Sequence, residues 1–440
     1  MNMSMHIWVR ALGFGSMLLG AAQAETKIER APLEIKTNIE LGQIVDGRNG
    51  YRQPDIKLEG QTIQRTGVSL NQATTVNDRL TIKVGVGGLF FYTLPEDRTQ
   101  TASRTTQFGP GVGQAQGIFK AGDLAAEPWT IQFGLFPYKY NNDAKNLGEY
   151  LLRSGTYPGY EVTGGWNIMN SAMYMASGIH VNKGFGGGKF TVDANIFMER
   201  DIEPLYDFTP SLMVNFKPGE FFELGGGAVF SHLIPVHKRG ATPNNASNKY
   251  RGDSVVTQSD DTLPGSYYTF KGIKVGAHAA LNFGSLIDNE WIGKNNLKLY
   301  GEVALLGVEN YPYYYEKPIN RMPMMAGFNW PTFKLFDVLA TEVEYRRWDF
   351  PNDIYQAFDS ALPIWNVDPT AYDPKKPGKD YNWKWTVYGK RKIVDGVTVY
   401  AQAASDYMRS IRPTDFSPER LPITRTPSQW YYLFRFEFSI

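Results

Sequence analysis

The chain has 440 residues, a formal net charge of +1 and no cysteine. The near-zero charge argues against nucleic acid as a partner, because nucleic-acid-binding domains usually carry a basic excess. The absence of cysteine excludes disulfide scaffolds and metal sites built from thiolates.

The first 24 residues have the layout of a secretory signal peptide. A short start that carries Arg10 is followed by an apolar stretch at 11–22, and the small residues Ala22 and Ala24 flank Gln23. This order of a basic, an apolar and a small-residue region predicts cleavage after Ala24. The apolar stretch is too short to span a bilayer. We therefore expect residues 1–24 to be removed and the protein to leave the cytoplasm.

After residue 30, apolar residues alternate with polar ones along most of the chain. The sequence RLTIKVGV, for example, places Leu80 and Ile82 on one face and Thr81 and Lys83 on the other. A period of two residues predicts β-strands. We predict sixteen strands, with fourteen or eighteen as alternatives, at residues 33–46, 62–72, 79–93, 111–122, 128–138, 169–183, 188–199, 206–217, 220–232, 268–283, 296–309, 320–330, 335–349, 382–392, 396–407 and 428–440.

The connections between these strands alternate in length. A long connection at 47–61 is followed by a short one at 73–78, and a long one at 94–110 by a short one at 123–127. Antiparallel strands with short turns at one end and long loops at the other are typical of outer-membrane barrels, in which the short turns are periplasmic. A propeller would show a repeat of one blade, and a sandwich would have shorter strands. We therefore expect residues 25–440 to form one all-β domain, a transmembrane antiparallel barrel.

The chain ends in QWYYLFRFEFSI, in which every second residue is large and apolar. With its signal peptide, alternating strands and alternating connections, the chain resembles the bacterial outer-membrane porins over residues 25–440, without matching one subfamily. The resemblance implies an outer-membrane location, contact with outer-membrane lipid, a homotrimer and diffusion of small hydrophilic solutes. It also implies recognition by the barrel-assembly machinery, although the last residue in that family is commonly Phe or Trp and here is Ile440.

Porins fold their third external loop into the barrel, and residues 141–166 occupy that position. Within this loop, the spacing of apolar residues predicts a helix over 143–155 that begins at Asp143 and ends at Gly155. An ordinary surface loop with one helical turn is the alternative. The expected constriction residues are Asp143, Lys145, Glu149 and Arg153.

Charged residues at inward positions of the predicted strands are expected to line the lumen. Both signs occur, so the sequence predicts no ring of one sign that would select cations or anions. The alternative is that these charges are solvated in a wide lumen. The expected lumen-wall residues are Lys83, Lys274, Lys298, Glu302, Glu342, Glu344, Arg346, Lys384, Arg435 and Glu437.

The sequence offers no catalytic or metal-binding pattern. None of its five histidines has a serine at a recognisable spacing, and there is no HExxH, phosphate-binding loop or metal cluster. We therefore expect a protein that is not an enzyme and needs no cofactor. Two external segments, 309–320 and 361–385, are rich in Tyr, Trp and Pro. Because aromatic faces suit sugar rings, a non-conducting barrel that acts in surface adhesion or carbohydrate binding is the alternative to a channel.

Overall fold

The computed structural model describes residues 26–49, 56–91, 107–156, 174–199, 206–234, 236, 271–287, 289, 291–308, 317–347, 383–408 and 422–440. The predicted signal peptide and most of both aromatic segments, 309–320 and 361–385, lie outside the described residues, as do residues 157–166 of the third loop.

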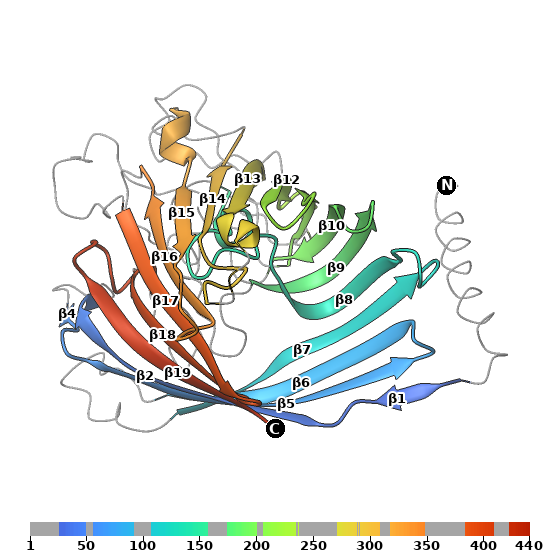
Figure 1. Ribbon diagram of the computed structural model, residues 1–440, viewed down its shortest axis with the longest axis horizontal. Coiled ribbons are helices and arrows are strands. Elements are labelled where there is room, and N and C mark those ends of the chain that lie inside the picture. Colours follow the sequence, from blue (N-terminus) through green and yellow to red (C-terminus); the bar gives the residue numbers. More distant parts are fainter. Residues whose placement is uncertain are drawn as a thin grey trace, which may run out of the picture.

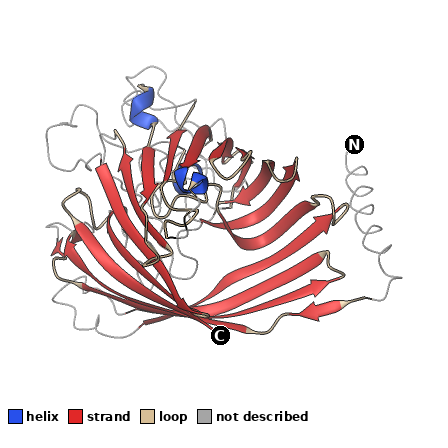
Figure 2. Ribbon diagram, viewed as in Figure 1, coloured by secondary structure: helices blue, strands red, loops and turns tan. Residues whose placement is uncertain are grey.

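The described chain forms a closed antiparallel β-barrel (Figures 1 and 2). Its main sheet contains 17 strands, of which sixteen form the closed wall and one, β1, is added along β5. Each wall strand pairs with the next in chain order, and β19 closes the barrel onto β2. The predicted all-β barrel of sixteen strands is therefore confirmed. The wall strands are β2 (Glu34–Asp46), β5 (Thr62–Val76), β6 (Leu80–Phe91), β7 (Gln107–Ala121), β8 (Trp129–Tyr138), β9 (Tyr174–Phe185), β10 (Phe190–Met198), β11 (Phe208–Phe216), β12 (Phe222–Ser231), β13 (Gly272–Asn282), β14 (Lys298–Leu305), β15 (Met324–Asn329), β16 (Val338–Tyr345), β17 (Trp383–Val394), β18 (Val397–Ser405) and β19 (Trp430–Ser439).

Three short strands were not expected from the sequence. β1 (Ile28–Arg30) pairs with β5 beyond the end of β2, so the two strands lie in line along β5. β3 (Arg48–Asn49) and β4 (Ile56–Lys57) form a separate two-stranded sheet. Strands of two or three residues are too short to show a two-residue period, which is why the sequence pattern does not reveal them.

The helices of the described residues are single turns. They are α2 (Tyr150–Arg153) and the 3₁₀ helices η2 (Phe283–Leu286) and η4 (Pro318–Arg321). None of the helices in the described part of the chain is long and apolar enough to cross a membrane.

Side chains alternate between the outside and the inside of the barrel, as the pleat of a strand requires. On β6, Ile82, Val84 and Val86 point outward and are 45–46% exposed. On β16, Glu342 and Glu344 point inward and are at most 1% exposed. The apolar residues thus form the outer surface, and most of the charged residues of these strands lie inside.

The residues of the short turns explain why the strands reverse direction there. The β5–β6 turn contains Asn77 and Asp78 with φ of 51° and 58°, the left-handed conformation that tight hairpins require. Gly186 to Gly188 and Gly396 supply the same positive φ in the β9–β10 and β17–β18 turns. These turns share one end of the barrel with the C-terminus, since the N–H of Ser439 donates to the carbonyl of Gly396.

A buried ion pair links the first and last wall strands. Nε of Arg435 on β19 donates to Oε1 of Glu40 on β2 over 2.7 Å, and both side chains are at most 6% exposed. The two residues are directly opposite in the register of β19 and β2. The pair joins the two strands whose hydrogen bonds close the barrel.

Candidate functional site

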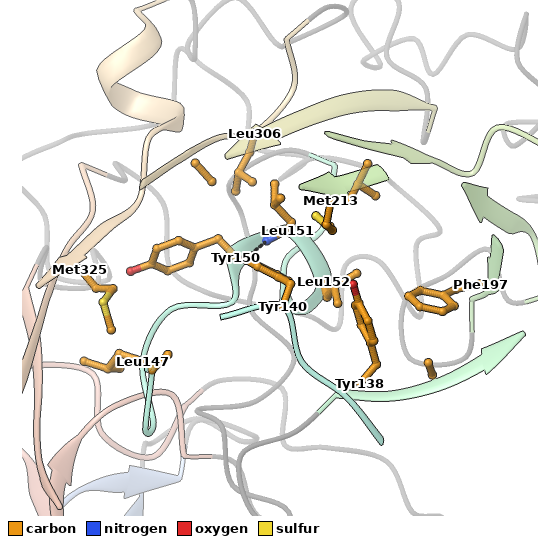
Figure 3. Close-up of a cluster of buried hydrophobic side chains, with 14 of the residues drawn as sticks. Tyr138, Tyr140, Leu147, Tyr150, Leu151, Leu152, Phe197, Met213, Leu306 and Met325 are labelled. Atoms are coloured by element: carbon orange, nitrogen blue, oxygen red, sulfur yellow. Dashed lines mark hydrogen bonds between the residues drawn. The ribbon is translucent and has the colours of Figure 1, made fainter. Parts of the chain in front are cut away.

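The connection between β8 and β9 packs inside the barrel, against the inner faces of several wall strands (Figure 3). We call its described residues, 139–156, the inner segment. Leu147, Tyr150 and Leu151 are at most 1% exposed and belong to one apolar cluster with Tyr300 of β14 and Met325 of β15. Burial of these apolar side chains is favourable, so it stabilises the segment against the wall relative to a position in solvent.

Glu302 of β14 binds the inner segment at several points. Its carboxylate accepts hydrogen bonds from the hydroxyl of Tyr140 (2.5 Å), the side-chain amide of Asn141 (2.7 Å) and the backbone N–H groups of Glu149 and Tyr150 (3.0 and 2.9 Å). The Tyr140 hydroxyl also accepts from the backbone N–H of Leu151 over 3.1 Å. One buried carboxylate thus accepts hydrogen bonds from both ends of the stretch 140–150.

Glu342 of β16 holds the middle of the segment. Its carboxylate accepts from the backbone N–H groups of Lys145, Asn146 and Leu147, at 2.5, 2.9 and 2.9 Å. The hydroxyl of Tyr300 donates to the same carboxylate over 2.9 Å. Since the side chain is fully buried, these charge-assisted hydrogen bonds compensate for the loss of its hydration.

Glu344 and Arg346 extend this network along the wall. Nε of Arg346 lies 2.5 Å from Oε1 of Glu344, which also accepts from the hydroxyls of Tyr407 (2.7 Å) and, through its other oxygen, Tyr150 (3.0 Å). The guanidinium carbon of Arg346 lies 5.2 Å from the ring centre of Tyr150 and 4.5 Å from that of Tyr407. Arg346 therefore contributes to binding the segment through the aromatic ring of Tyr150.

The predicted constriction residues Asp143 and Lys145 also contact the wall. The carboxylate of Asp143 accepts from Nζ of Lys298 on β14 over 2.6 Å. Nζ of Lys145 donates to the carbonyl of Asp143 over 2.7 Å and lies 5.5 Å from the ring centre of Tyr300. Burial lowers the pKa of the Lys145 amine to about 8.

The predicted helix over 143–155 is wrong. Only α2, one turn long, is present, and Asp143 does not cap it. Gly148 and Glu149 adopt positive φ of 87° and 60°, which interrupts a right-handed helix. Glu302 and Glu342 also bind backbone N–H groups that a helix would use internally, so contacts with the wall override the local helical pattern.

Glu149 and Arg153, expected to share a helix face, bind different partners. The Glu149 carboxylate accepts from the backbone N–H groups of Tyr140 and Asn141, at 3.2 and 2.8 Å. The Arg153 guanidinium donates to the carbonyls of Asn146 and Gly148. Burial, reinforced by the nearby charge of Glu302, raises the pKa of Glu149 to about 7, while Lys139 and Arg153 oppose this shift. The hydrogen bonds of Glu149 and Arg153 therefore link parts of the inner segment to one another.

Lys274 and Lys384, two further predicted wall residues, bind carbonyls of long connections. Nζ of Lys274 on β13 donates to the carbonyl of Ser154 over 2.9 Å. Nζ of Lys384 on β17 donates to the carbonyl of Thr424, between β18 and β19, over 2.7 Å. Both lysines are almost fully buried and serve as donors to folded loops.

Lys83, Arg435 and Glu437 also point inward, but their contacts in the described part of the chain are with other parts of the wall. Lys83 on β6 lines an open cavity together with Asn71 and Gln114. Glu437 on β19 accepts from the hydroxyl of Tyr400 at 3.5 Å. The predicted lumen-wall residues therefore fall into one group that holds the inner segment and another that lies elsewhere on the wall.

Several polar residues at this site were not among the expected ones. Asn146 donates from its side chain to Asp406 over 2.8 Å, and Asp406 also accepts from the hydroxyl of Tyr431 over 2.7 Å. Burial raises the pKa of the Asp406 carboxyl. These residues join the inner segment to the connection between β18 and β19. The sequence criterion was a charged residue at an inward position of a predicted strand. Asn146 is neutral and Asp406 lies just beyond a strand, so neither meets this criterion. In the described part of the chain, no group of three or more His, Asp or Glu residues is arranged to hold a metal ion.

Comparison with known proteins gives structural matches alone. No protein-family model matches the chain, and no curated protein does. Solved structures similar to it include OmpF of Salmonella typhi in complex with daunomycin (9% identity, TM-score 0.46, 94% of this chain and 98% of that one), OmpT of Vibrio cholerae in a trimer form (13%, 0.42, 94% and 99%) and a mutant of the Rhodopseudomonas blastica porin (10%, 0.43, 94% and 100%). The structural neighbours are porins, and they single out no subfamily.

Proposed function

We propose that this protein is an outer-membrane channel through which small hydrophilic solutes diffuse, narrowed by its inner segment. The observation that carries this proposal is a closed barrel whose outward residues are apolar, whose inward residues are polar, and whose third long connection is bound to the inner wall. Such a barrel needs no catalytic group, so we propose a protein that is not an enzyme.

The outer surface supports a location in lipid. In lipid, every backbone polar group must be paired within the protein, and a closed barrel meets this condition because it has no free edge. Exposed apolar residues such as Leu70, Val84, Leu212 and Phe434 lie on strands far apart in the chain. Aromatic residues at strand ends, such as Trp129 and Trp383, which are 48% and 50% exposed, suit the membrane–water interface.

The contacts of the inner segment support a role as a constriction. Its carboxylate anchors, Glu302 and Glu342, are on neighbouring parts of the wall, so the segment covers β14 to β16 from the inside. A solute that crosses the lumen must then pass beside it. We propose that residues 143–155, together with the undescribed remainder of the loop to 166, set the size limit of the channel.

The resemblance to porins also leads us to propose insertion by the barrel-assembly machinery and a homotrimer. The solved Vibrio cholerae OmpT is a trimer form. For this chain we expect a native mass of three protomers in detergent, and the mass of a single protomer would refute the trimer.

Single-channel conductance in a planar bilayer tests the proposed function. We compare the refolded barrel with a variant in which residues 143–155 are replaced by a short glycine–serine linker. Steady conductance steps that grow on replacement support a channel narrowed by this segment. A variant with the same linker in place of residues 395–396, at the opposite end of the barrel, is the control and should leave the step size unchanged. Absence of steps in the unaltered protein would refute the channel.

A further inference from the structure

The inner face of the barrel from β5 to β11 carries a row of polar side chains that are hydrogen-bonded to one another. It begins on β5, where the Asn71 amide donates to the hydroxyl of Ser69 over 3.2 Å. The amide of Gln114 on β7 donates to Oδ1 of Asn71 over 3.1 Å, across the intervening β6. The β6 residue between them is Gly85, and a Cβ there would lie 2.3 Å from Oδ1 of Asn71. The glycine therefore leaves the space through which the row crosses β6.

The row continues through three side-chain amides that all donate in the same direction. Gln116 donates to Gln114 over 2.8 Å, and Gln132 of β8 donates to Gln116 over 2.5 Å. Oε1 of Gln132 lies 3.2 Å from Nδ1 of His180 on β9. A primary amide has two N–H groups and two acceptor lone pairs. Gln116 and Asn195 are buried, but Asn71 and Gln114 line open space and use only part of this capacity within the row, so their remaining donors and acceptors are left for a solute.

At the far end of the row, an imidazole faces a carboxylate. Nε2 of His180 lies 3.0 Å from Oδ1 of Asp193 on β10, and Oδ2 of Asp193 accepts from the hydroxyl of Tyr138 over 3.1 Å. The Asn195 amide then donates to the hydroxyls of Tyr138 and Ser211, at 3.3 and 3.1 Å. We call Ser69, Asn71, Gln114, Gln116, Gln132, His180, Asp193, Tyr138, Asn195 and Ser211 the polar row.

The first part of the polar row faces open space. Ser69, Asn71 and Gln114 line a cavity of about 440 Å³ that also touches Lys36 and Lys83. Its volume lies within the range of small-molecule sites. The cavity is thus large enough to hold a small solute against the start of the row.

Charge distinguishes this side of the lumen from the side that holds the inner segment. On β14 to β17, Glu302, Glu342 and Lys384 are buried in contacts with loop atoms. The members of the polar row are amides and hydroxyls, except for the imidazole of His180 and the carboxylate of Asp193, which face each other. Lys36 at the cavity is paired with Glu34 at 3.3 Å, and Lys83 adds a positive charge to the cavity lining. From Asn71 to Gln132 the row therefore offers hydrogen bonds from uncharged amides.

We propose that the polar row binds uncharged, hydroxyl-rich solutes, the class of small saccharides and polyols, on their way through the channel. A hydroxyl both donates and accepts, and so does each amide of the row, which lets a sugar exchange its water hydrogen bonds for protein ones. A charged solute loses part of its hydration beside these amides, which carry no opposite charge to compensate for it. This inference rests on the proposed channel function and adds the class of solute.

Block of the ion current by maltotriose tests the inference on the full barrel. We expect saturable block of the unaltered channel. In the double variant Gln114→Leu/Gln132→Leu, which keeps the side-chain size and removes the hydrogen bonds, the half-blocking concentration should rise by about fivefold or more, since one hydrogen bond contributes on that scale. The control is Gln402→Leu on β18, whose amide bonds Tyr431 outside the row, and its block should match that of the unaltered channel.

A second measurement uses only the unaltered protein, in case the double variant does not fold. Liposome swelling compares glucose with glucosamine, which has nearly the same size but carries a positive charge. We expect glucose to enter several-fold faster than glucosamine, because the amides of the row do not compensate the ammonium charge and Lys83 repels it. A channel that conducts ions, is not blocked by maltotriose and admits glucosamine as fast as glucose overturns the inference while leaving the channel function intact. A barrel that conducts nothing overturns both.

Discussion

The carboxylate of Glu302 accepts the backbone N–H of Tyr150 over 2.9 Å, although 152 residues separate them in the chain. This hydrogen bond joins the wall of the barrel to the only α-helical turn among the described residues. A backbone donor cannot be removed by mutation of its own side chain, so the wall carboxylate is the place at which this contact can be altered.

Replacing both anchors, Glu302→Gln and Glu342→Gln, should release the inner segment. The amide keeps the size of the carboxylate but loses the charge, and half of its polar atoms become donors that face other donors. Hydrogen bonds to charged groups contribute about 1.5–3 kcal/mol each, so loss of several of them should free the segment from the wall. We expect larger or noisier single-channel steps, with the barrel still folded.

The control for this double variant is Glu437→Gln. Glu437 is also an inward carboxylate, but it accepts a hydrogen bond from Tyr400 on the neighbouring strand and not from the inner segment. Its conductance should equal that of the unaltered channel. Equal conductance in all three proteins would show that the two anchors do not hold the segment in its narrowing position.

The barrel itself could be predicted from the sequence because apolar and polar residues alternate along each strand. This alternation can be read from neighbouring residues, since the outer face is apolar and the inner face is polar. Residues such as Ile82 and Lys83 alternate because one must point outward and the other inward. Each of the sixteen predicted ranges overlaps one wall strand, and twelve of them contain the whole strand. β1 and the β3–β4 pair were not predicted because they are too short to show a two-residue period.

The candidate site could be predicted only in part. The inward direction of Glu302 and Glu342 follows from the same alternation, but their partners at Tyr150 and Asn146 lie about 150 and 200 residues away. No local pattern reveals such pairings. The spacing of apolar residues in 143–155 suggested a helix because Leu147 and Leu151 are four apart, whereas both are buried in a segment with a positive-φ break at Gly148.

Lys83 should influence ion selectivity. Its amine lines the open cavity, where the other lysine is paired with a carboxylate. Lys83→Glu changes the local charge by two, and a charge in a narrow lumen alters the relative permeability of cations and anions. We expect the permeability ratio of K⁺ to Cl⁻, obtained from the reversal potential in a salt gradient, to rise several-fold. In the control Lys392→Glu, the altered side chain lies 57% exposed beside Asp395, where salt screens it, and the ratio should not change.

The Glu344–Arg346 pair should contribute to the stability of the folded barrel. Arg346→Met leaves the buried Glu344 carboxylate with its two tyrosine hydroxyls and without the guanidinium. Removing one partner of a buried ion pair costs about 3–5 kcal/mol. We expect the midpoint of urea unfolding, followed by tryptophan fluorescence in detergent, to fall clearly. Adding Glu344→Gln to Arg346→Met should restore part of the loss, and a double variant that is less stable by the full sum of the single effects would contradict a direct interaction.

The pH should alter how firmly the inner segment is held, through Glu149. Its carboxyl pKa is raised from 4.5 to about 7, first by burial and then by Glu302. A raised pKa means that the folded segment favours the protonated form. The stabilisation is fully present below pH 4.5 and is lost as the pH rises through 7, and a shift of this size corresponds to about 3 kcal/mol. Lys145, with its pKa lowered from 10.5 to about 8, changes stability in the separate window between pH 8 and 10.5. We expect current noise from the segment to increase between pH 5 and pH 7.5. Glu149→Gln, which is neutral throughout, should make the noise independent of pH in this range, and an unchanged pH profile in that variant would assign the effect to another group.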